Sequence, residues 1–231
     1  MELTFYGHSC FYLQKKDTGV LIDPWLRQNP VVKEFPAKLK PSLILVSHGH
    51  GDHLGDAVEI AKGANCPILS TPEVIYHCGK GGAKTMPGHY GGTVRFDFGQ
   101  VKFVPAWHSS SVTVGEDRVY AGNPCGFVIK FYGLTFYHAG DTCLFLDMKL
   151  IGDRNNLDYA FLPVGGLFTM DPEDALEAVK LLHAKTVIPM HYNTWDRIAQ
   201  KVEDFQAAVQ KQKVGKCQLM KPGETIQIED R

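Results

Sequence analysis

Short apolar runs recur along the 231-residue chain, and most of them are too short to form a helix. They hold four to six residues and are rich in branched and aromatic side chains, which is the pattern of buried strands. The predicted strands cover residues 3–6, 10–13, 19–22, 43–46, 66–69, 93–96, 101–105, 126–131, 134–137, 186–190, 217–220 and 225–228.

After residues 53, 71, 143, 171 and 194, apolar residues recur at the spacing of a helix instead of in short runs. The start at Asp171 is marked most clearly, because this aspartate precedes Pro172 and two further acids, an arrangement that caps a helix N-terminus. The buried stripe of this helix is predicted to consist of Leu176, Val179 and Leu182. The helix after Thr194 is predicted to bury Ile198, Val202, Phe205 and Val209.

The order of these elements favours a fold class. Strands follow one another in runs, and helices interrupt the runs. This order is neither the strict alternation of a doubly wound sheet nor an all-β pattern, and it fits two mixed sheets with helices outside them. No shift in composition marks a boundary, so residues 1–231 are predicted to form one domain.

Two segments are predicted to be connections. Prolines punctuate residues 29–41, which indicates a loop. Residues 79–92 contain six glycines and predict a flexible connection that could cover a functional site.

Composition narrows the expected partners. Hydrophobic residues make up 44% of the chain and charged residues 21%, which is typical of a soluble globular protein. The formal net charge is −1, and Lys and Arg form no basic run, so neither nucleic acid nor an anionic membrane is an expected partner. A small-molecule substrate is expected instead, and a homo-oligomer is compatible with the sequence.

The chain has no apolar stretch as long as a membrane-spanning helix, and its first six residues enter a strand pattern without a signal-peptide signature. None of the six cysteines forms a CxxC pair. We therefore expect a cytoplasmic protein with buried, reduced thiols at Cys10, Cys66, Cys78, Cys125, Cys143 and Cys217.

The segment 47–53 reads Ser-His-Gly-His-Gly-Asp-His and lies between a predicted strand and helical spacing. His48 and His50 alternate with a glycine, so in extended backbone both imidazoles point to the same side. Asp52 and His53 then face a second point. Imidazole and carboxylate together suit zinc, iron or manganese better than calcium or magnesium. The segment therefore predicts half of a two-metal site.

At three other places a ligand-type side chain follows a predicted strand by one to four residues. These are His108, then His138 or Asp141, and His191. Because the chain already carries the 47–53 segment, we expect these three places to supply the other half of the site.

The order HxHxDH, His, Asp, His resembles the metallo-β-lactamase superfamily. Segments at 7–9, 47–53, 121–124, 137–142 and 189–192 are similar to a narrower branch of small, mostly uncharacterised metal-dependent hydrolases from bacteria and archaea. That branch is related to ascorbate-6-phosphate lactonase and N-acyl-phosphatidylethanolamine phospholipase D. The resemblance covers nearly the whole chain. It implies an α/β protein with the metallo-β-lactamase fold, a four-layer αββα sandwich of two mixed β-sheets flanked by helices, with metals at one edge.

The resemblance also implies a ligand set. One metal ion would be held by His48, His50 and His108. The other would be held by Asp52, His53 and His191, and Asp141 would bridge the two. The implied cofactor is a pair of divalent metal ions, with zinc as the first choice and manganese, iron or nickel as alternatives.

Two residues are candidates for proton transfer. Asp52 is placed to orient the nucleophile and to take its proton. His8 matches a histidine of the narrower branch that sits near the active site, and either His8 or a metal-bound water could protonate the leaving group. A turn histidine without function is the alternative reading of His8.

The remaining candidates have a structural role as their first interpretation. His138 in an extended strand points away from Asp141. The other histidines without a strand-end context are His77, His89 and His183. Residues that could contact a substrate or wall a pocket are Ser109, Ser110, Ser111, Asn123, Phe168, Tyr192 and Trp195.

The implied function is that of a dinuclear hydrolase in which a metal-bridging hydroxide attacks a small lactone, ester or phosphodiester. Family analogy alone ranks the lactone or ester first. Residue 141 is an aspartate where some lactamases carry cysteine, which disfavours penicillin-type lactams. Two alternatives stay open: a mononuclear iron oxygenase of sulfur compounds on the same fold, and a metal-binding protein without catalytic activity.

Overall fold

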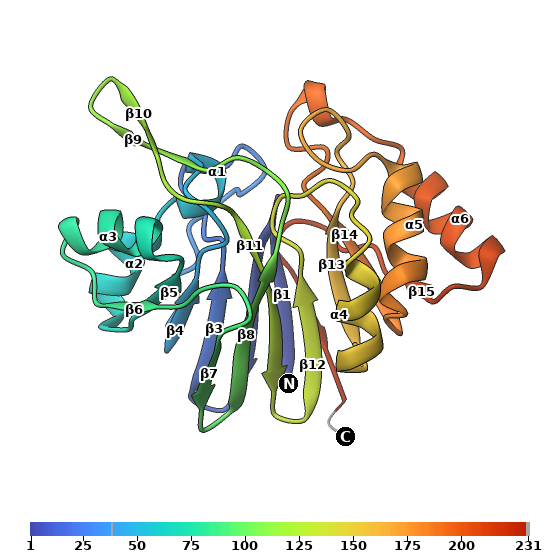
Figure 1. Cartoon of the computed structure of the whole chain (residues 1–231), viewed down its shortest axis with the longest axis horizontal. Coiled ribbons are helices and arrows are strands. Elements are labelled where there is room, and N and C mark those ends of the chain that lie inside the picture. Colours follow the sequence, from blue (N-terminus) through green and yellow to red (C-terminus); the bar gives the residue numbers. More distant parts are fainter. Residues whose placement is uncertain (38, 230–231) are drawn as a thin grey trace. The chain divides into compact units, whose positions relative to one another are not determined.

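The computed structural model describes residues 1–37 and 39–229. These residues form two compact units, each built around its own seven-stranded sheet (Figure 1). The first unit comprises Met1–His89, Ser109–Pro124 and a C-terminal stretch that starts at Lys221. The second comprises Tyr90–His108 and Cys125–Met220. The prediction of one domain stays a prediction.

The sheet of the first unit has the strand order β16-β1-β2-β3-β4-β5-β6. Its first four strands pair antiparallel and the others pair parallel, so the sheet is mixed. A separate two-stranded hairpin joins β9 to β10. The elements are β1 Glu2–Gly7, β2 Cys10–Lys15, β3 Thr18–Ile22, β4 Leu43–Leu45, α1 Gly51–Leu54, α2 Ala57–Ala64, β5 Ile68–Ser70, α3 Pro72–Lys80, β6 Thr85–Pro87, β9 Ser111–Val114, β10 Asp117–Tyr120 and β16 Glu224–Gln227.

The sheet of the second unit has the order β15-β14-β13-β12-β11-β8-β7 and is also mixed. Strands β7, β8, β11 and β12 pair antiparallel, whereas β12 to β15 pair parallel. The elements are β7 Thr93–Phe96, β8 Gly99–Pro105, β11 Cys125–Phe131, β12 Leu134–His138, α4 Met148–Asn155, β13 Tyr159–Pro163, α5 Pro172–Leu182, β14 Thr186–Met190, the 3-10 helix Asp196–Ile198, α6 Val202–Gln212 and β15 Lys216–Cys217.

Strand direction decides where each unit can build a site. In the first unit β1 runs parallel to β3 through the intervening β2, and β3 pairs parallel with β4. The carboxyl ends of these three strands therefore meet at one edge of the sheet. In the second unit the same reasoning brings the ends of β8, β12 and β14 to one edge. Every predicted ligand follows one of these strand ends.

The core of the first unit explains why its helices form. α2 buries Ala57, Ile60 and Ala61, which recur at helical spacing. These side chains join a cluster that contains Leu21 and Ile44 from β3 and β4. Complete burial of a side chain such as Ile44 contributes about 1.5–3 kcal/mol relative to exposure.

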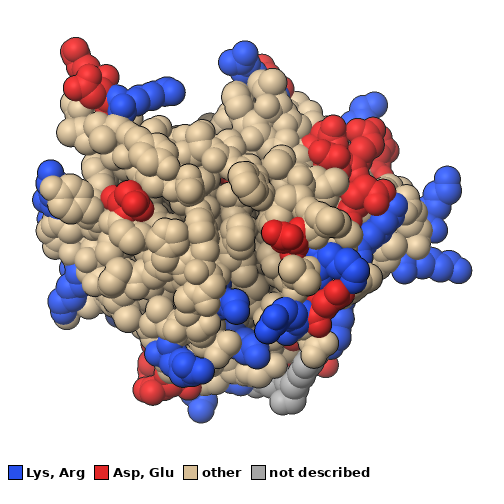
Figure 2. All heavy atoms as spheres, viewed as in Figure 1, with Lys and Arg blue, Asp and Glu red and all other residues tan. Residues whose placement is uncertain are grey.

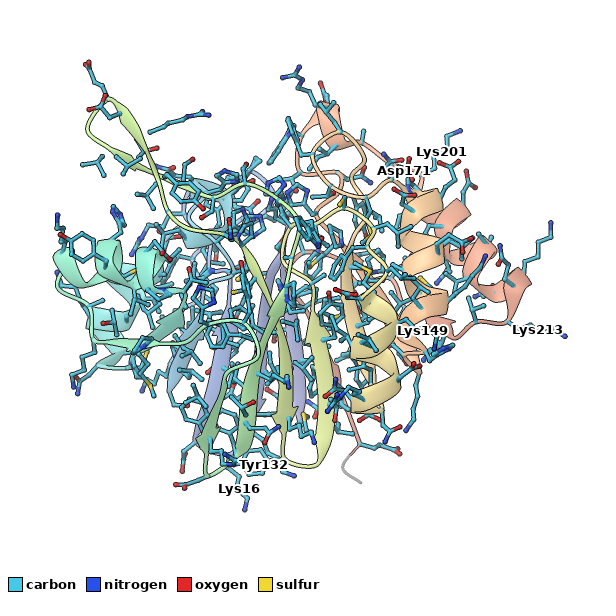
Figure 3. The ribbon with its side chains drawn as sticks, in the orientation of Figure 1. Lys16, Tyr132, Lys149, Asp171, Lys201 and Lys213 are labelled. Carbon is cyan, nitrogen blue, oxygen red and sulfur yellow. The ribbon has the colours of Figure 1, made fainter. Side chains whose placement is uncertain are left out.

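The helix predicted after Asp171 is α5, and its start is confirmed. The Asp171 carboxylate accepts a hydrogen bond of 2.9 Å from the backbone N–H of Asp174, so Asp171 is the N-cap (Figure 3). The first turn of α5 carries Glu173 and Asp174, whose charges are favourable at a helix N-terminus, and red side chains gather in this region of the surface in Figure 2. Leu176 is only half-buried, and Ala175 and Ala178 complete the buried stripe instead.

Two expectations about elements were wrong, and further elements were missed. Residues 79–92 are not simply a connection, because β6 within them pairs parallel with β5. The helix expected after Thr194 begins only at Val202, since a 3-10 turn that ends at Ile198 comes first. The hairpin β9–β10 and the strand β13 were not predicted.

No helix in the described part of the chain combines the length and the apolar character needed to cross a membrane. On the face shown in Figure 2, basic and acidic side chains are interspersed, in keeping with a net charge of −1.

The cysteines differ from the expectation at one position. Five of the six are buried, but Cys143 is exposed. Burial raises the pKa of Cys66 to about 11 and the pKa values of Cys78 and Cys217 to about 12. A raised pKa lowers the fraction of reactive thiolate at neutral pH.

We therefore expect one fast-reacting thiol per chain when the folded protein is treated with Ellman's reagent at pH 8. The other five should react only after guanidinium unfolds the chain, because their sulfur atoms are shielded. A Cys143→Ser variant should have no fast thiol. Two or more fast thiols in the folded wild-type protein would contradict this burial pattern.

Candidate metal-binding site

The first unit gathers its candidate ligands where β4 ends. His48 Nε2 lies 3.0 Å from His50 Nδ1, and the ring centroids of the two imidazoles are 4.6 Å apart. This confirms that the two imidazoles converge across the intervening glycine. His48 is fully buried, whereas His50 is half-buried.

A second group of donors lies beside the first. His8, Asp52 and His53 each offer a ligand atom within 4.8 Å of the other two. The ring centroids of His48 and His53 are 4.2 Å apart, so the two groups are neighbours within this unit. Asp52 and His53 belong to the short helix α1 rather than to an irregular turn, which corrects the expected local structure.

His8 contacts Asp52, the other residue expected to transfer protons. Its Nε2 lies 3.2 Å from Oδ2 of Asp52. The His8 side chain is completely buried, whereas 27% of the Asp52 side chain is exposed. The ring of His8 also meets the edge of Trp25, with centroids 5.2 Å apart. A histidine held in this way is a better candidate for function than an ordinary turn residue.

Asp23 is the residue that sequence reasoning missed. Its carboxylate is fully buried and lies 2.7 Å from three atoms: the backbone N and the Oγ of Ser47, and Nδ1 of His53. Because a carboxylate only accepts, His53 donates its Nδ1–H and presents Nε2 as the ligand nitrogen. The available signal was an Asp-Pro pair directly after the strand 19–22, which reads as a turn.

Two further contacts fix the 47–53 segment. The Ser110 hydroxyl accepts a 3.0 Å hydrogen bond from the N–H of Gly49 and donates one of 3.0 Å to the carbonyl of Ala121. A Cβ on Gly49 would lie 2.9 Å from a methyl group of Val112. Glycine is therefore needed at position 49, and Ser110 is a structural residue rather than a substrate contact.

The second unit builds its own cluster around Asp141. Oδ2 of Asp141 lies 3.1 Å from Nε2 of His191 and 3.6 Å from Nε2 of His108. Asp141 and His191 are buried, and His108 is partly exposed. The three predicted ligands of this unit are thus brought together, as the strand directions require.

Hydrogen bonds tie the loops of this second cluster together. The N–H of Trp107 donates to Oγ1 of Thr142 at 3.0 Å, and the N–H of Cys143 donates to the carbonyl of Trp107 at 3.2 Å. These bonds hold the residues next to His108 and Asp141 against each other. Gly165 allows close approach on the other side, because a Cβ there would collide with the carbonyl of His191.

Three site residues adopt the left-handed backbone conformation that side chains rarely take. The φ angles are 55° for His8, 46° for Asp23 and 56° for His191. Such a conformation costs about 1–3 kcal/mol and persists where the surrounding structure enforces it. Each of these three residues lies directly after a strand, and its side chain belongs to one of the two clusters.

His138 lies outside these clusters, as predicted. It is fully buried at the end of β12, where its Nδ1 accepts a 3.2 Å hydrogen bond from the N–H of Gly140. Its ring meets the edge of Phe161, with centroids 6.0 Å apart.

We expect His138→Gln to lower stability by about 1–3 kcal/mol, because it disturbs a buried hydrogen bond, and to leave metal content near the wild-type value. Thermal unfolding and elemental analysis of the purified variant measure the two effects. His108→Gln is the matched control and should lose metal. A complete loss of metal from His138→Gln would overturn its assignment as a core residue.

The other candidates divide into structural and surface residues. His183 ends α5 in the left-handed conformation, so its role is a helix C-cap. Asn123 accepts a 2.9 Å hydrogen bond from the Tyr120 hydroxyl, and Phe168 is 44% exposed. His77 lies on α3 and His89 is exposed.

Tyr192 and Trp195 remain close to a ligand. Trp195 lies edge-on to His191, with ring centroids 6.3 Å apart. Burial raises the pKa of Tyr192 to about 12, so its hydroxyl stays protonated at neutral pH and can donate a hydrogen bond.

The chemistry of both donor sets suits a transition metal or zinc. Each unit offers imidazole nitrogens together with a carboxylate, and in the first unit the ligand atoms lie close enough to share an ion. The Asp23 carboxylate also orients His53 through its Nδ1–H, as is usual for a histidine that ligates metal.

Comparisons with known proteins also indicate a metal-dependent protein. A family model described as "Beta-lactamase superfamily domain" matches residues 2–191. A relative from Pelotomaculum thermopropionicum, named UPF0173 metal-dependent hydrolase, is 49% identical over 229 residues, which cover 99% of this chain and 100% of the relative. The solved structure of Igni18, described as a metallo hydrolase from the archaeon Ignicoccus hospitalis, is 35% identical with a TM-score of 0.91 and covers 100% of this chain and 99% of that chain.

A third match comes from Thermotoga maritima and is provisionally described as a Zn-dependent hydrolase of the metallo-beta-lactamase superfamily. It is 22% identical with a TM-score of 0.58, and the match covers 88% of this chain and 83% of that chain. Together with the family model, it confirms the predicted fold class: a metallo-β-lactamase fold with two mixed seven-stranded sheets and helices.

Proposed function

Because the chain belongs to the UPF0173 family of metal-dependent hydrolases in the metallo-β-lactamase superfamily, we propose that it uses two divalent cations to hydrolyse a small lactone, ester or phosphodiester. The names of the three proteins described above support metal-dependent hydrolysis, and none of these three names gives a substrate. The lactone or ester remains the first choice by family analogy.

The observation that carries this proposal is the arrangement of donors at the strand ends of each unit. In the first unit, His48 Nε2 lies 3.0 Å from His50 Nδ1. In the second unit, Oδ2 of Asp141 lies within 3.6 Å of both His108 Nε2 and His191 Nε2. We assign the metal ligands as the resemblance implies, namely His48, His50, Asp52, His53, His108, Asp141 and His191. Zinc is the proposed metal, with manganese, iron or nickel as alternatives.

When bound, such cations lower the pKa of water to about 7 and polarise the group under attack. The residues of the chain supply the proton transfers. The 3.2 Å contact between Oδ2 of Asp52 and Nε2 of His8 lets a proton pass from the carboxyl group to the imidazole. We therefore propose that Asp52 takes the proton of the nucleophile and that His8 delivers a proton to the leaving group.

Metal content and turnover test the proposal together. The protein is purified, its metals are measured, and the zinc- or manganese-loaded form is assayed against lactones, carboxylic esters and phosphodiesters. Two zinc or manganese ions per chain and turnover of one class would support the proposal. His50→Ala should lose both metal and turnover, whereas the matched control His89→Ala, at an exposed position, should keep both.

Two outcomes would replace the proposal. A single iron per chain, with oxygen uptake in the presence of a thiol persulfide, would identify the oxygenase alternative. Bound metal without turnover of any of the three classes would favour a metal-binding protein without catalytic activity.

A further inference from the structure

A pocket with a volume of about 960 Å³ lies entirely within the first unit. Its walls come from α1 and α2, from α3, and from the hairpin β9–β10. The hairpin and these helices lie on the same side of the unit in Figure 1. Pockets that bind small molecules in proteins have volumes of about 300–1,000 Å³, so this one has room for a ligand of ordinary size.

One wall is a single face of α3. Glu73, Tyr76, His77 and Lys80 line the pocket and are spaced three, four and seven residues from the first, so they lie on one side of the helix. The opposite side of α3 carries the buried Val74 and is anchored in the core. The pocket-facing side therefore has no partner from the core of this unit.

The facing wall is the hairpin. Val112 pairs directly with Val119 across its two strands, and Val114 lies on the same face two residues further on. Val119 is 45% exposed and Val114 is 51% exposed. A two-stranded hairpin is only marginally stable by itself. An apolar face that is exposed to water lowers its stability further.

The base of the hairpin rests on the segment that carries the metal ligands. Val112 packs over Gly49, and Ser110 is hydrogen-bonded to the N–H of the same glycine. Leu54, another pocket residue, directly follows His53 in α1. The pocket therefore adjoins the donor cluster of the first unit through continuous backbone.

The charges of the pocket balance, which indicates the chemistry of its occupant. The lining holds one acid, Glu73, one lysine, Lys80, and one histidine, His77; the Lys80 ammonium group lies 4.5 Å from the ring centroid of Tyr76. The remaining surface is mostly apolar, with Leu54, Val58 and the hairpin valines. Such a lining favours an uncharged apolar group over a phosphate or a carboxylate.

We propose that this pocket binds the apolar organic group of the substrate, an alkyl chain or an aromatic ring, beside the reacting ester or lactone. The proposal rests on the proposed hydrolase function for the identity of the substrate, and on the pocket alone for the binding of an apolar group. It predicts that catalytic efficiency rises with the length of the apolar chain.

Binding is tested without catalysis by the fluorescence of N-phenyl-1-naphthylamine, an uncharged apolar probe, added to the metal-loaded protein. The wild-type protein should bind it with a micromolar dissociation constant. Val119→Asp and Val114→Asp place a charge on the exposed hairpin wall and should weaken binding at least tenfold. Leu150→Asp, at a 59% exposed position on α4, is the matched control and should bind the probe as the wild type does.

Selectivity is tested with p-nitrophenyl acetate and p-nitrophenyl octanoate. Burial of each added methylene contributes a factor of about four at most, so kcat/KM for the octanoate should exceed that for the acetate by tenfold or more. Val119→Asp should reduce this ratio at least tenfold, and Leu150→Asp should leave it unchanged. Circular dichroism of each variant checks that it is folded.

The outcomes separate the two proposals. Probe binding that Val119→Asp removes, in a protein that hydrolyses no ester, would retain the apolar pocket and overturn the ester-hydrolase function. Equal probe binding by the wild type and both hairpin variants would overturn the pocket. A dimer that Val119→Asp dissociates, seen by light scattering and without probe binding, would show that a second copy covers this face and would also overturn it.

Discussion

Asp141→Ala is expected to reduce metal affinity more than about 100-fold and to abolish hydrolysis, while the fold survives. Even residues that only orient a metal ligand contribute about 10–100-fold to affinity, and Asp141 is assigned as a direct ligand. Its carboxylate is the acid within 3.1 Å of His191 and 3.6 Å of His108, so its removal leaves the second cluster with imidazoles alone.

Elemental analysis and thermal unfolding of the variant measure this effect. Asp158→Ala is the matched control, because Asp158 is also a buried acid of the second unit and accepts hydrogen bonds from the Thr135 N–H and the Lys185 ammonium. The control should lose stability and retain metal. If Asp141→Ala kept the wild-type metal content, Asp141 would not be a bridging ligand.

Four of the assigned ligands could be predicted because they form one local signal. His48, His50, Asp52 and His53 lie within six residues of one another, after an apolar run that could only be a short strand. The convergence of His108, Asp141 and His191 depends on strand direction, which the sequence pattern does not report. Their assignment therefore came from the family resemblance, and the parallel pairing of β12, β13 and β14 supplies its physical reason within the second unit.

Asp23 could not be found in this way. A lone Asp-Pro after a strand is typical of an ordinary turn, and its contacts with Ser47 and His53 arise only because β3 pairs parallel with β4. The role of Asp23 therefore depends on tertiary contacts, which the local sequence does not reveal. The same holds for Ser110, whose hydroxyl joins two segments that are 61 residues apart in sequence.

The missed elements also have physical reasons. The hairpin β9–β10 is largely exposed. β9 (Ser111–Val114) alternates polar residues with valine over only four positions, and β10 (Asp117–Tyr120) shows no alternation, so the pair gives no clear strand signal. Gly115, with φ of 63°, was the available turn signal. In residues 79–92 the glycines concealed β6, a three-residue edge strand whose pairing with β5 outweighs its weak local preference.

Asp23→Ala is expected to lower both stability and metal affinity, although Asp23 is not assigned as a ligand. The substitution removes the acceptor for the Ser47 N–H, the Ser47 hydroxyl and the His53 Nδ1–H, all in a fully buried place. Each buried donor left without an acceptor costs about 1–3 kcal/mol, so the loss of stability should be about 3 kcal/mol or more. Metal affinity should fall about 10–100-fold, because His53 is then no longer held in one tautomer and orientation.

Asp23→Asn separates the two effects. Oδ1 of residue 23 accepts from the Ser47 N–H, and an asparagine carbonyl can still do so, whereas the amide group in place of Oδ2 cannot accept from His53. Asn at this position should therefore recover part of the stability and none of the metal affinity. Guanidinium unfolding and zinc competition with a chelator measure these quantities. Asp56→Ala, which removes a carboxylate that accepts from the N–H groups of Leu26 and Arg27, should lower stability alone. If Asp23→Asn bound zinc as tightly as the wild type, the buried carboxylate would stabilise the loop without orienting His53.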